Sequence, residues 1–183
     1  MKSKNLVKIL STVVGLVVTL LFAVLVVADP SQDVIARSPL LGQPAPGVTS
    51  QTIDGENFVL ERRKGSWVVL NFFNSTCVPC VSEHDLLLEF AKVEQTKKNA
   101  AELYTIINDD SPDAVRSFFQ KNGGSWPKIR DDNGAIAVAF GVARVPETWI
   151  IDPNGVVRLR ITGELSPGLL SGQVDKLREG FTS

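Results

Sequence analysis

The only two cysteines of this 183-residue chain, Cys77 and Cys80, are separated by Val78 and Pro79 and stand at the start of a segment with helical periodicity. A helix N-terminus offers unpaired N–H groups and about half a positive charge, which together favour a thiolate at the first cysteine. Cys77 is therefore the expected nucleophile. Cys80, one turn into the helix, can attack a mixed disulfide at Cys77 and release the partner. Pro79 removes a backbone donor and stiffens this turn, which should affect the reduction potential.

Other chemistries have weaker support. A structural disulfide between these cysteines would close a very short loop and constrain the unfolded chain little. A zinc site needs two further thiolate or imidazole ligands, and His84 is the only histidine. We therefore expect no metal. For peroxide chemistry, only Thr76 stands beside Cys77 to polarise a peroxide. Dinucleotide-binding and phosphate-loop patterns are missing, so we expect no soluble cofactor. Because no basic stripe is present, we expect no nucleic-acid partner.

The N-terminal region has the pattern of a membrane anchor. Three lysines precede a run of 20 uncharged, mostly apolar residues from Ile9 to Ala28, and Asp29 follows it. As a helix this run spans about 30 Å, the thickness of a bilayer's hydrocarbon core. By the positive-inside rule, the basic segment 1–8 stays in the cytoplasm. We therefore predict a single-pass anchor over 9–28 in the cytoplasmic membrane and a catalytic domain on the extracytoplasmic face.

A cleaved signal peptide is the alternative interpretation of this region. Val26 and Ala28 have small side chains of the kind that a signal peptidase accepts. The apolar core of a signal peptide normally has about 7–15 residues, however, and this run is longer. The length favours a retained anchor.

The elements that must position the cysteine pair are expected along the exported part. Residues 29–39 are rich in Pro and Ser and are predicted to form a linker, followed by one domain over 40–183. We expect a short hairpin over 52–60 and a buried central strand over 67–73, where the sequence is WVVLNFF. A helix should follow from 79 to 95, with an apolar face formed by Val81, Leu87, Leu88 and Ala91.

The remaining pattern alternates strands and helices. A strand is expected over 103–107, and Ser111-Pro112 predicts the start of a helix that ends at Gly123-Gly124. We also expect a short helix, an antiparallel hairpin and a last helix, over 136–140, 148–161 and 166–179. This order predicts an α/β fold with a mixed sheet covered on both faces and the cysteine pair at the carboxyl end of a central strand.

Two segments, NFFNSTCVPCVSEH and GVARVPETWIIDPNG, resemble a known family. They are similar to the extracytoplasmic thioredoxin-like proteins of cytochrome c maturation, the DsbE/CcmG type, with the ResA and TlpA types as near relatives. The resemblance runs from about residue 40 to the C-terminus. It implies a thioredoxin fold with an N-terminal β-hairpin extension.

The resemblance also implies a substrate groove beside the cysteines. Pro146 would be a cis-proline facing the pair, and the backbone of Val145 would bind a peptide in strand-like fashion, with Val78 and Pro79 taking part. The alternative interpretation of Pro146 is a strand-starting proline in a loop.

Acidic residues near the pair are further candidates. Glu83, three residues after Cys80, stands where members of this group often carry an acid that tunes the cysteine pKa or relays a proton. The alternative is an ordinary acid in the first turns of a helix, stabilised by the dipole. Glu164 resembles another acidic position beside the site. His84 is interpreted as a surface or supporting residue.

Two positions depart from thioredoxins proper. Asn71 stands where those proteins have a buried acid six residues before the first cysteine, so another group must accept the proton or exchange must be slower. Thr76 replaces the tryptophan that commonly precedes this cysteine. Asn71 and Thr76 are therefore candidates for supporting roles, and Trp149 is assigned to the core.

The function implied by the resemblance is that of a dithiol reductase. It would receive electrons from a membrane thiol relay and pass them to an oxidised cysteine pair in apocytochrome c. Two alternatives stay open. One is a reductase or oxidase of other exported proteins, since the direction depends on a reduction potential that the sequence does not disclose. The other is a non-catalytic peptide-binding module that uses the Pro146 groove.

Overall fold

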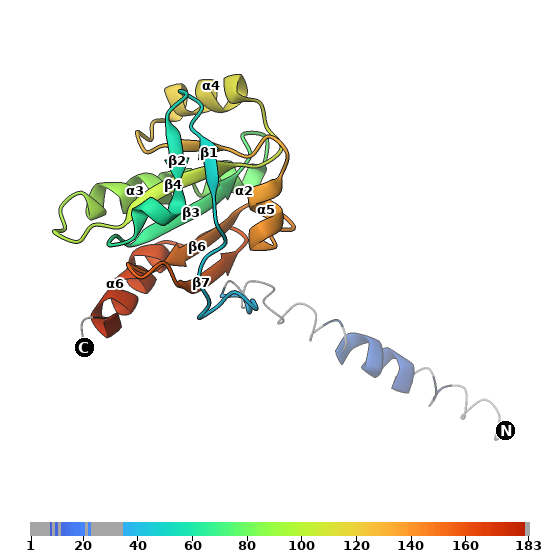
Figure 1. Cartoon of the computed structure of the whole chain (residues 1–183). Coiled ribbons are helices and arrows are strands. Elements are labelled where there is room, and N and C mark those ends of the chain that lie inside the picture. The colour runs from blue at the N-terminus through green and yellow to red at the C-terminus, as the bar shows by residue number, and fades with distance from the viewer. Residues whose placement is uncertain (1–7, 9, 11, 21, 23–34, 182–183) are drawn as a thin grey trace. The chain divides into compact units, whose positions relative to one another are not determined.

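The computed structural model describes residues 8, 10, 12–20, 22 and 35–181. The chain divides into two units, Met1–Asp33 and Val34–Ser183 (Figure 1). The described residues of the first unit are helical. No helix formed by described residues is long and apolar enough to cross a membrane. Nine of the 20 residues of the predicted anchor over 9–28 lie outside the described residues, and so does the whole of the alternative cleavage site near Ala28. The anchor and the cleavage site therefore both stay predictions.

A five-stranded sheet in the order β5-β4-β3-β6-β7 forms the centre of the second unit (Figure 1). The strands are β3 (Val68–Phe73), β4 (Glu102–Ile107), β5 (Lys128–Arg130), β6 (Glu147–Ile151) and β7 (Val157–Thr162). β3 pairs parallel with β4 and antiparallel with β6, and all its residues are buried. The predicted mixed sheet and its central strand are confirmed. β5 was not predicted, because three residues are too few to show a period.

One face of the sheet is covered by most of the helices. They are α2 (Val78–Ser82), α3 (His84–Glu94), α4 (Pro112–Asn122) and α6 (Leu169–Phe181). The crossovers from β3 to β4 and from β4 to β5 step in the same direction along the sheet, so right-handed connections put their helices on the same face. Side chains of β3, such as Val69 and Phe73, share one core cluster with Leu87, Val115 and Val174 of these helices.

The opposite face is covered by α5 (Ala135–Phe140), the hairpin β1 (Thr49–Gln51) and β2 (Asn57–Val59), and the short 3-10 helix η1 (Leu60–Arg63). Trp149 is fully buried here, with its ring centroid 5.4 Å from that of Phe140, which confirms its assignment to the core. The hairpin forms a separate two-stranded sheet. The predicted hairpin extension is thus confirmed, with β2 inside the expected span 52–60 and β1 just before it.

The predicted helix over 79–95 is in fact two helices that meet at Glu83. Glu83 has φ −77° and ψ −7°, and its N–H donates to the carbonyls of Pro79 and Val81 at the end of α2. At this junction the Glu83 side chain is fully buried, whereas Val81 is 43% exposed. Val81 was therefore wrongly placed on the apolar face, whereas Leu87 is buried as expected.

The N-terminal end of the second unit pairs with β7. Ile35 forms an antiparallel bridge with Ile161, and the N–H of Ala36 donates to the carbonyl of Arg160 at 2.9 Å. The compact unit therefore reaches back into the segment predicted to be a linker, 29–39.

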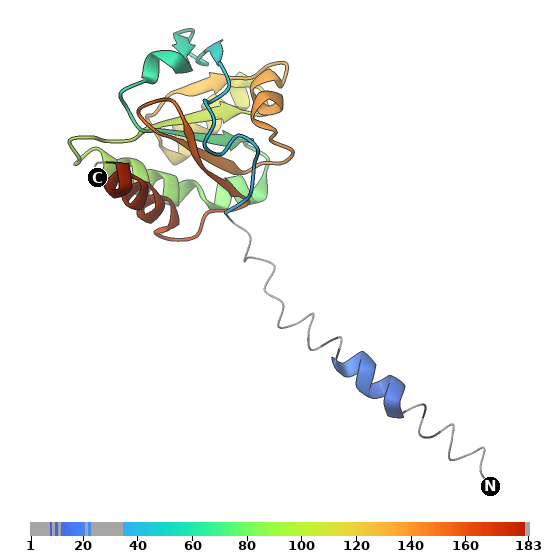
Figure 2. The ribbon, with the colours of Figure 1, turned by 60° about the horizontal axis from the view of Figure 1, so that its bottom comes forward.

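A buried ion cluster joins α3 to α6, which lie side by side (Figure 2). Glu94 is 2% exposed, and its carboxylate accepts hydrogen bonds from the guanidinium of Arg178 at 2.7 Å and from the N–H of Ala101 at 2.6 Å. Lys97 also pairs with Glu94, at 2.9 Å. Glu94 thus connects two helices and the chain leading into β4.

Replacing Glu94 by Ala should lower the free energy of unfolding by about 3 kcal/mol, because the substitution leaves the buried N–H of Ala101 without its acceptor and removes one of the two carboxylates that pair with Arg178, the other being Asp175. Glu89→Ala, at an exposed position of the same helix, should change it by less than about 0.5 kcal/mol. Urea unfolding of both full-length variants measures the difference. Equal stability of the two variants would contradict a buried role for Glu94.

Candidate active site

Cys77 and Cys80 form a disulfide where β3 ends and α2 begins. Cys77 is the N-cap of α2, and its Sγ accepts a hydrogen bond from the N–H of Cys80 at 3.2 Å. Cys80 is fully buried, whereas Cys77 is partly exposed. The site therefore offers one sulfur to an incoming partner and shields the other, as expected for an attacking and a resolving cysteine.

The loop before Cys77 is fixed to the end of β4. The side-chain amide of Asn74 donates to the carbonyl of Asn108 at 3.0 Å, and the carboxylate of Asp110 accepts from the N–H of Ser75 at 2.6 Å. Asn74 also accepts from the hydroxyl of Thr76 at 2.7 Å. Thr76 thus stabilises the conformation of this loop. Asn74, which was not predicted from the sequence, makes most of the side-chain hydrogen bonds that hold the loop in place.

The Val145–Pro146 peptide bond is cis, as predicted. The carbonyl oxygen of Val145 lies 3.7 Å from the Sγ of Cys77, so this loop directly faces the disulfide. A groove of about 420 Å³ opens beside it, and its lining residues are Pro79, Ala143, Arg144, Val145, Pro146, Glu147, Arg160, Thr162 and Gly163. The structure thus brings Pro79, Val145 and Pro146 together. Val78 is not among the lining residues and stands 79% exposed beside the pair.

Glu83 is fully buried and held by groups from two other elements. Its carboxylate accepts from the side-chain amide of Asn71 on β3 and from the N–H of Leu165 after β7, both at 2.9 Å. Burial raises the pKa of Glu83 to about 7; the two hydrogen bonds oppose this shift, and the nearby charge of Glu164 adds to it. Asn71 also donates to the hydroxyl of Thr148 at 3.1 Å, so it bridges β6 and Glu83.

Glu164 lies beside this group but at the surface. Its carboxylate accepts from the hydroxyl of Ser82 at 2.6 Å, which ties the end of α2 to the loop after β7. Ser82, Thr148 and the N–H of Leu165 were not predicted as parts of the site. No signal in the sequence marks them, because the partners stand about 80 residues apart along the chain and only folding brings them together.

His84 is not a surface residue, which corrects one interpretation of the sequence. It is 3% exposed, and its Nε2 lies 3.1 Å from the carbonyl oxygen of Gly123. Its ring packs against Phe118 and Phe119 of α4, with centroids 4.9 and 5.2 Å away. Burial lowers the pKa of His84. The side chain supports the packing of α3 on α4.

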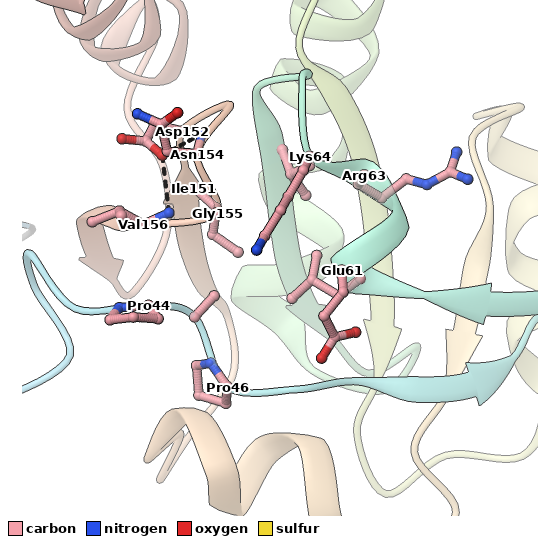
Figure 3. A pocket seen from close by; sticks show the side chains of 13 residues that line it. Pro44, Pro46, Glu61, Arg63, Lys64, Ile151, Asp152, Asn154, Gly155 and Val156 are labelled. Carbon is pink, nitrogen blue, oxygen red and sulfur yellow. Dashed lines mark hydrogen bonds between the residues drawn. The ribbon is translucent and has the colours of Figure 1, made fainter.

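A second pocket, of about 260 Å³, lies at the other end of the sheet (Figure 3). Val68 at the start of β3 and Ile151 at the end of β6 line it, so it is remote from Cys77. The Lys64 amine projects into the pocket. The carboxylate of Asp152 accepts a hydrogen bond from the backbone N–H of Val156 at 2.9 Å. No disulfide or histidine lines it. Among the residues that the structure describes, no group of His, Cys, Asp and Glu is arranged to hold a metal ion.

The sequence model of the AhpC/TSA family matches residues 41–160. The chain belongs to the AhpC/TSA family. Among known proteins, thiol-disulfide oxidoreductase ResA of Bacillus subtilis strain 168 is 26% identical over 142 residues, 78% of each chain. Thiol:disulfide interchange protein HelX of Rhodobacter capsulatus is 29% identical over 144 residues, which cover 77% of this chain and 78% of HelX.

Solved structures agree on the fold of this AhpC/TSA-family chain. A putative thiol:disulfide interchange protein DsbE from Chlorobium tepidum superposes with a TM-score of 0.66 at 23% identity, covering 73% of this chain and 94% of that one. A secreted Mycobacterium tuberculosis disulfide oxidoreductase gives 0.63 at 24%, covering 70% and 95%. The thioredoxin fold and the resemblance to the DsbE/CcmG and ResA types are therefore confirmed. The Cys77–Cys80 disulfide, together with the similarity to thiol-disulfide oxidoreductase ResA and interchange protein HelX, identifies the protein as a thiol–disulfide oxidoreductase.

The raised pKa of Glu83 predicts a pH-dependent stability. The carboxyl group of Glu83 holds its proton up to about pH 7 in the folded protein but only to about pH 4.5 in the unfolded chain. The contribution of Glu83 to the free energy of unfolding is therefore fully present below pH 4.5 and is lost as the pH rises through 7. Over this pH range the free energy of unfolding of the wild type should fall by about 3 kcal/mol relative to that of a Glu83→Gln variant, whose side chain cannot ionise. Urea unfolding of the oxidised full-length proteins from pH 4 to 8 measures the difference.

Glu89→Gln provides the control, because Glu89 is exposed on the same helix and should follow the wild-type curve. If wild type and Glu83→Gln instead ran parallel across this pH range, the carboxyl group of Glu83 would not be titrating near neutrality.

Proposed function

We propose that this protein is a dithiol reductase of the extracytoplasmic face, which reduces disulfides in exported proteins and has apocytochrome c as its substrate. The observation that carries the proposed disulfide exchange is the arrangement at Cys77, which is partly exposed at a helix N-terminus, with its Sγ 3.7 Å from the carbonyl oxygen of Val145 and an open groove beside it. The reductase direction is supported by the resemblance to the DsbE/CcmG type. The apocytochrome c assignment is supported by the resemblance of the cysteine and Pro146 segments to the DsbE/CcmG type.

The exchange proceeds in two steps. The Cys77 thiolate attacks one sulfur of the substrate disulfide, which forms a mixed disulfide and releases the other substrate sulfur as a thiolate that takes up a proton. Cys80 then loses its proton and attacks the Sγ of Cys77, so the second substrate thiol leaves and the Cys77–Cys80 disulfide remains. Two electrons pass to the substrate. A membrane thiol relay supplies two electrons to restore the dithiol.

Glu83 is proposed as the proton acceptor for Cys80. It follows Cys80 by three residues, and a carboxyl group with a pKa of about 7 can both take and return a proton near neutral pH. Asn71 and the N–H of Leu165 fix its orientation. Asn71 thus occupies the position of the acid in thioredoxins proper, while the acid itself comes from the helix.

Pro146 and Val145 are proposed to bind the substrate backbone. The cis bond directs the Val145 carbonyl toward Cys77, where an extended peptide can pair with it in strand-like fashion. Pro79 lines the same groove, and the exposed Val78 offers an apolar contact at its mouth. Thr76 and Glu164 are proposed as supporting residues at the edge of the site.

The membrane topology is proposed from the sequence. Residues 1–8 lie in the cytoplasm, 9–28 cross the cytoplasmic membrane and 29–39 link the anchor to the thioredoxin-like domain over 40–183. This arrangement keeps the domain close to a membrane reductant and to exported substrates.

The reduction potential of the Cys77/Cys80 couple tests the direction of exchange. Equilibration of the full-length protein with glutathione or dithiothreitol buffers should give a reduction potential of about −270 mV or lower, as for a thioredoxin-type reductase. A value near about −120 mV would instead identify an oxidase of exported proteins.

A Cys80→Ser variant separates the enzyme from a peptide-binding module. Without the resolving thiol, the mixed disulfide at Cys77 should accumulate with a disulfide-bearing substrate such as insulin, and it should be visible as a covalent adduct in non-reducing electrophoresis. Cys77→Ser is the matched control and should trap nothing. Absence of the adduct together with absence of insulin reduction by the wild type would support a binding module with an inert disulfide.

A further inference from the structure

The groove beside Val145 and Pro146 carries an unbalanced positive charge. Two arginines, Arg144 and Arg160, and one acid, Glu147, are among its lining residues. Whether a groove attracts charged partners depends on which of these charges are already neutralised within the protein.

Arg160 and Glu147 neutralise one another. The Nε of Arg160 donates to one carboxylate oxygen of Glu147 and its terminal NH2 to the other, both at 2.9 Å, in a bidentate pair. Glu147 is 2% exposed and also accepts from the indole N–H of Trp149 at 2.7 Å. The guanidinium of Arg160 lies over the ring of Trp149, 5.3 Å from its centroid. This pair is therefore a rigid, neutral wall of the groove.

Arg144 is the charge that remains. It is exposed, directly precedes Val145, and makes no ion pair or side-chain hydrogen bond with any residue of the described part of the chain. Glu164, which follows the groove residue Gly163, is not among the lining residues and is bound by Ser82. The guanidinium of Arg144 is thus free to bind a carboxylate presented by a partner.

The opposite flank of the disulfide has the opposite charge. A pocket at the ends of β4 and β5 is lined by four aspartates, Asp109, Asp110, Asp131 and Asp132. Asp132 forms an ion pair with Arg130, whereas Asp110 and Asp131 accept hydrogen bonds from backbone N–H groups, which leave their negative charge in place. The sheet order puts β4 and β5 on one side of β3, and β6, which begins after Arg144, on the other. A peptide that passes over Cys77 therefore meets aspartates on one side and Arg144 on the other.

We propose that Arg144 is a specificity residue that selects peptide substrates with an acidic side chain within two residues of the reacting cysteine, and that it orients them with this side chain toward β6. The inference rests on the proposed reductase function and names the class of substrate for the same site. Pairing of the substrate backbone with Val145 places its neighbouring side chains near Arg144. The aspartates on the other flank repel the acidic side chain and so disfavour the reversed orientation.

The test uses the reduced full-length protein and two synthetic peptides, each with an intramolecular disulfide, that differ only in carrying Asp or Lys at the positions flanking the disulfide. Rates of peptide reduction are measured by acid quenching and chromatography at low and at 1 M salt. The wild type should reduce the Asp peptide about fivefold faster at low salt, the size expected of an exposed ion pair, and the preference should vanish at 1 M. Arg144→Gln should abolish the preference and Arg144→Glu should invert it.

Arg62→Glu is the matched control, because Arg62 is exposed on η1, remote from Cys77, and its reversal changes the net charge equally. It should keep the wild-type preference. Equal rates for the two peptides in the wild type, or a preference that survives in Arg144→Gln, would overturn the assignment of Arg144 while leaving the reductase function intact. Reduction of neither peptide would overturn the proposed function and this inference with it.

Discussion

The Glu83 carboxyl group is buried at the junction of α3 with α2, the helix that contains Cys80. The free-energy cost of removing this group from water must be offset by hydrogen bonds from other parts of the fold. Asn71 on the central strand and the N–H of Leu165 provide those bonds. This requirement ties β3, the break between α2 and α3, and the loop before α6 to one another. The same burial keeps the acid largely neutral up to about pH 7, which suits a group that must exchange a proton with a cysteine.

The surroundings of Cys77 combine rigidity with access. Hydrogen bonds from Asn74 and to Asp110 hold the loop before the cysteine on the end of β4, and the Val145 carbonyl approaches the sulfur from the side of β6. Cys77 itself stays partly exposed. Because the neighbouring groups are fixed before a substrate arrives, little conformational entropy has to be lost on binding.

Charge around the site is distributed rather than uniform. The Arg160–Glu147 pair is buried on the Trp149 ring and contributes shape instead of net charge, whereas Arg144 projects from the same groove without a partner among the described residues. The aspartates at the ends of β4 and β5 give the other flank a negative field. An extended substrate over Cys77 would therefore lie between a basic residue on the side of β6 and acidic residues on the side of β4 and β5.

The sequence by itself determined the fold class, the central strand and the cysteine pair, because these depend on local patterns: a buried apolar run, a CxxC at a helix start, and turn residues between elements. The cis state of Pro146 was available only through resemblance. Tertiary structure alone decided that Glu83 breaks the helix and turns inward, that His84 is buried against α4, and that the three-residue strand β5 joins the sheet. Each of these depends on contacts between residues far apart in the chain, and helical or strand periodicity carries no information about such partners.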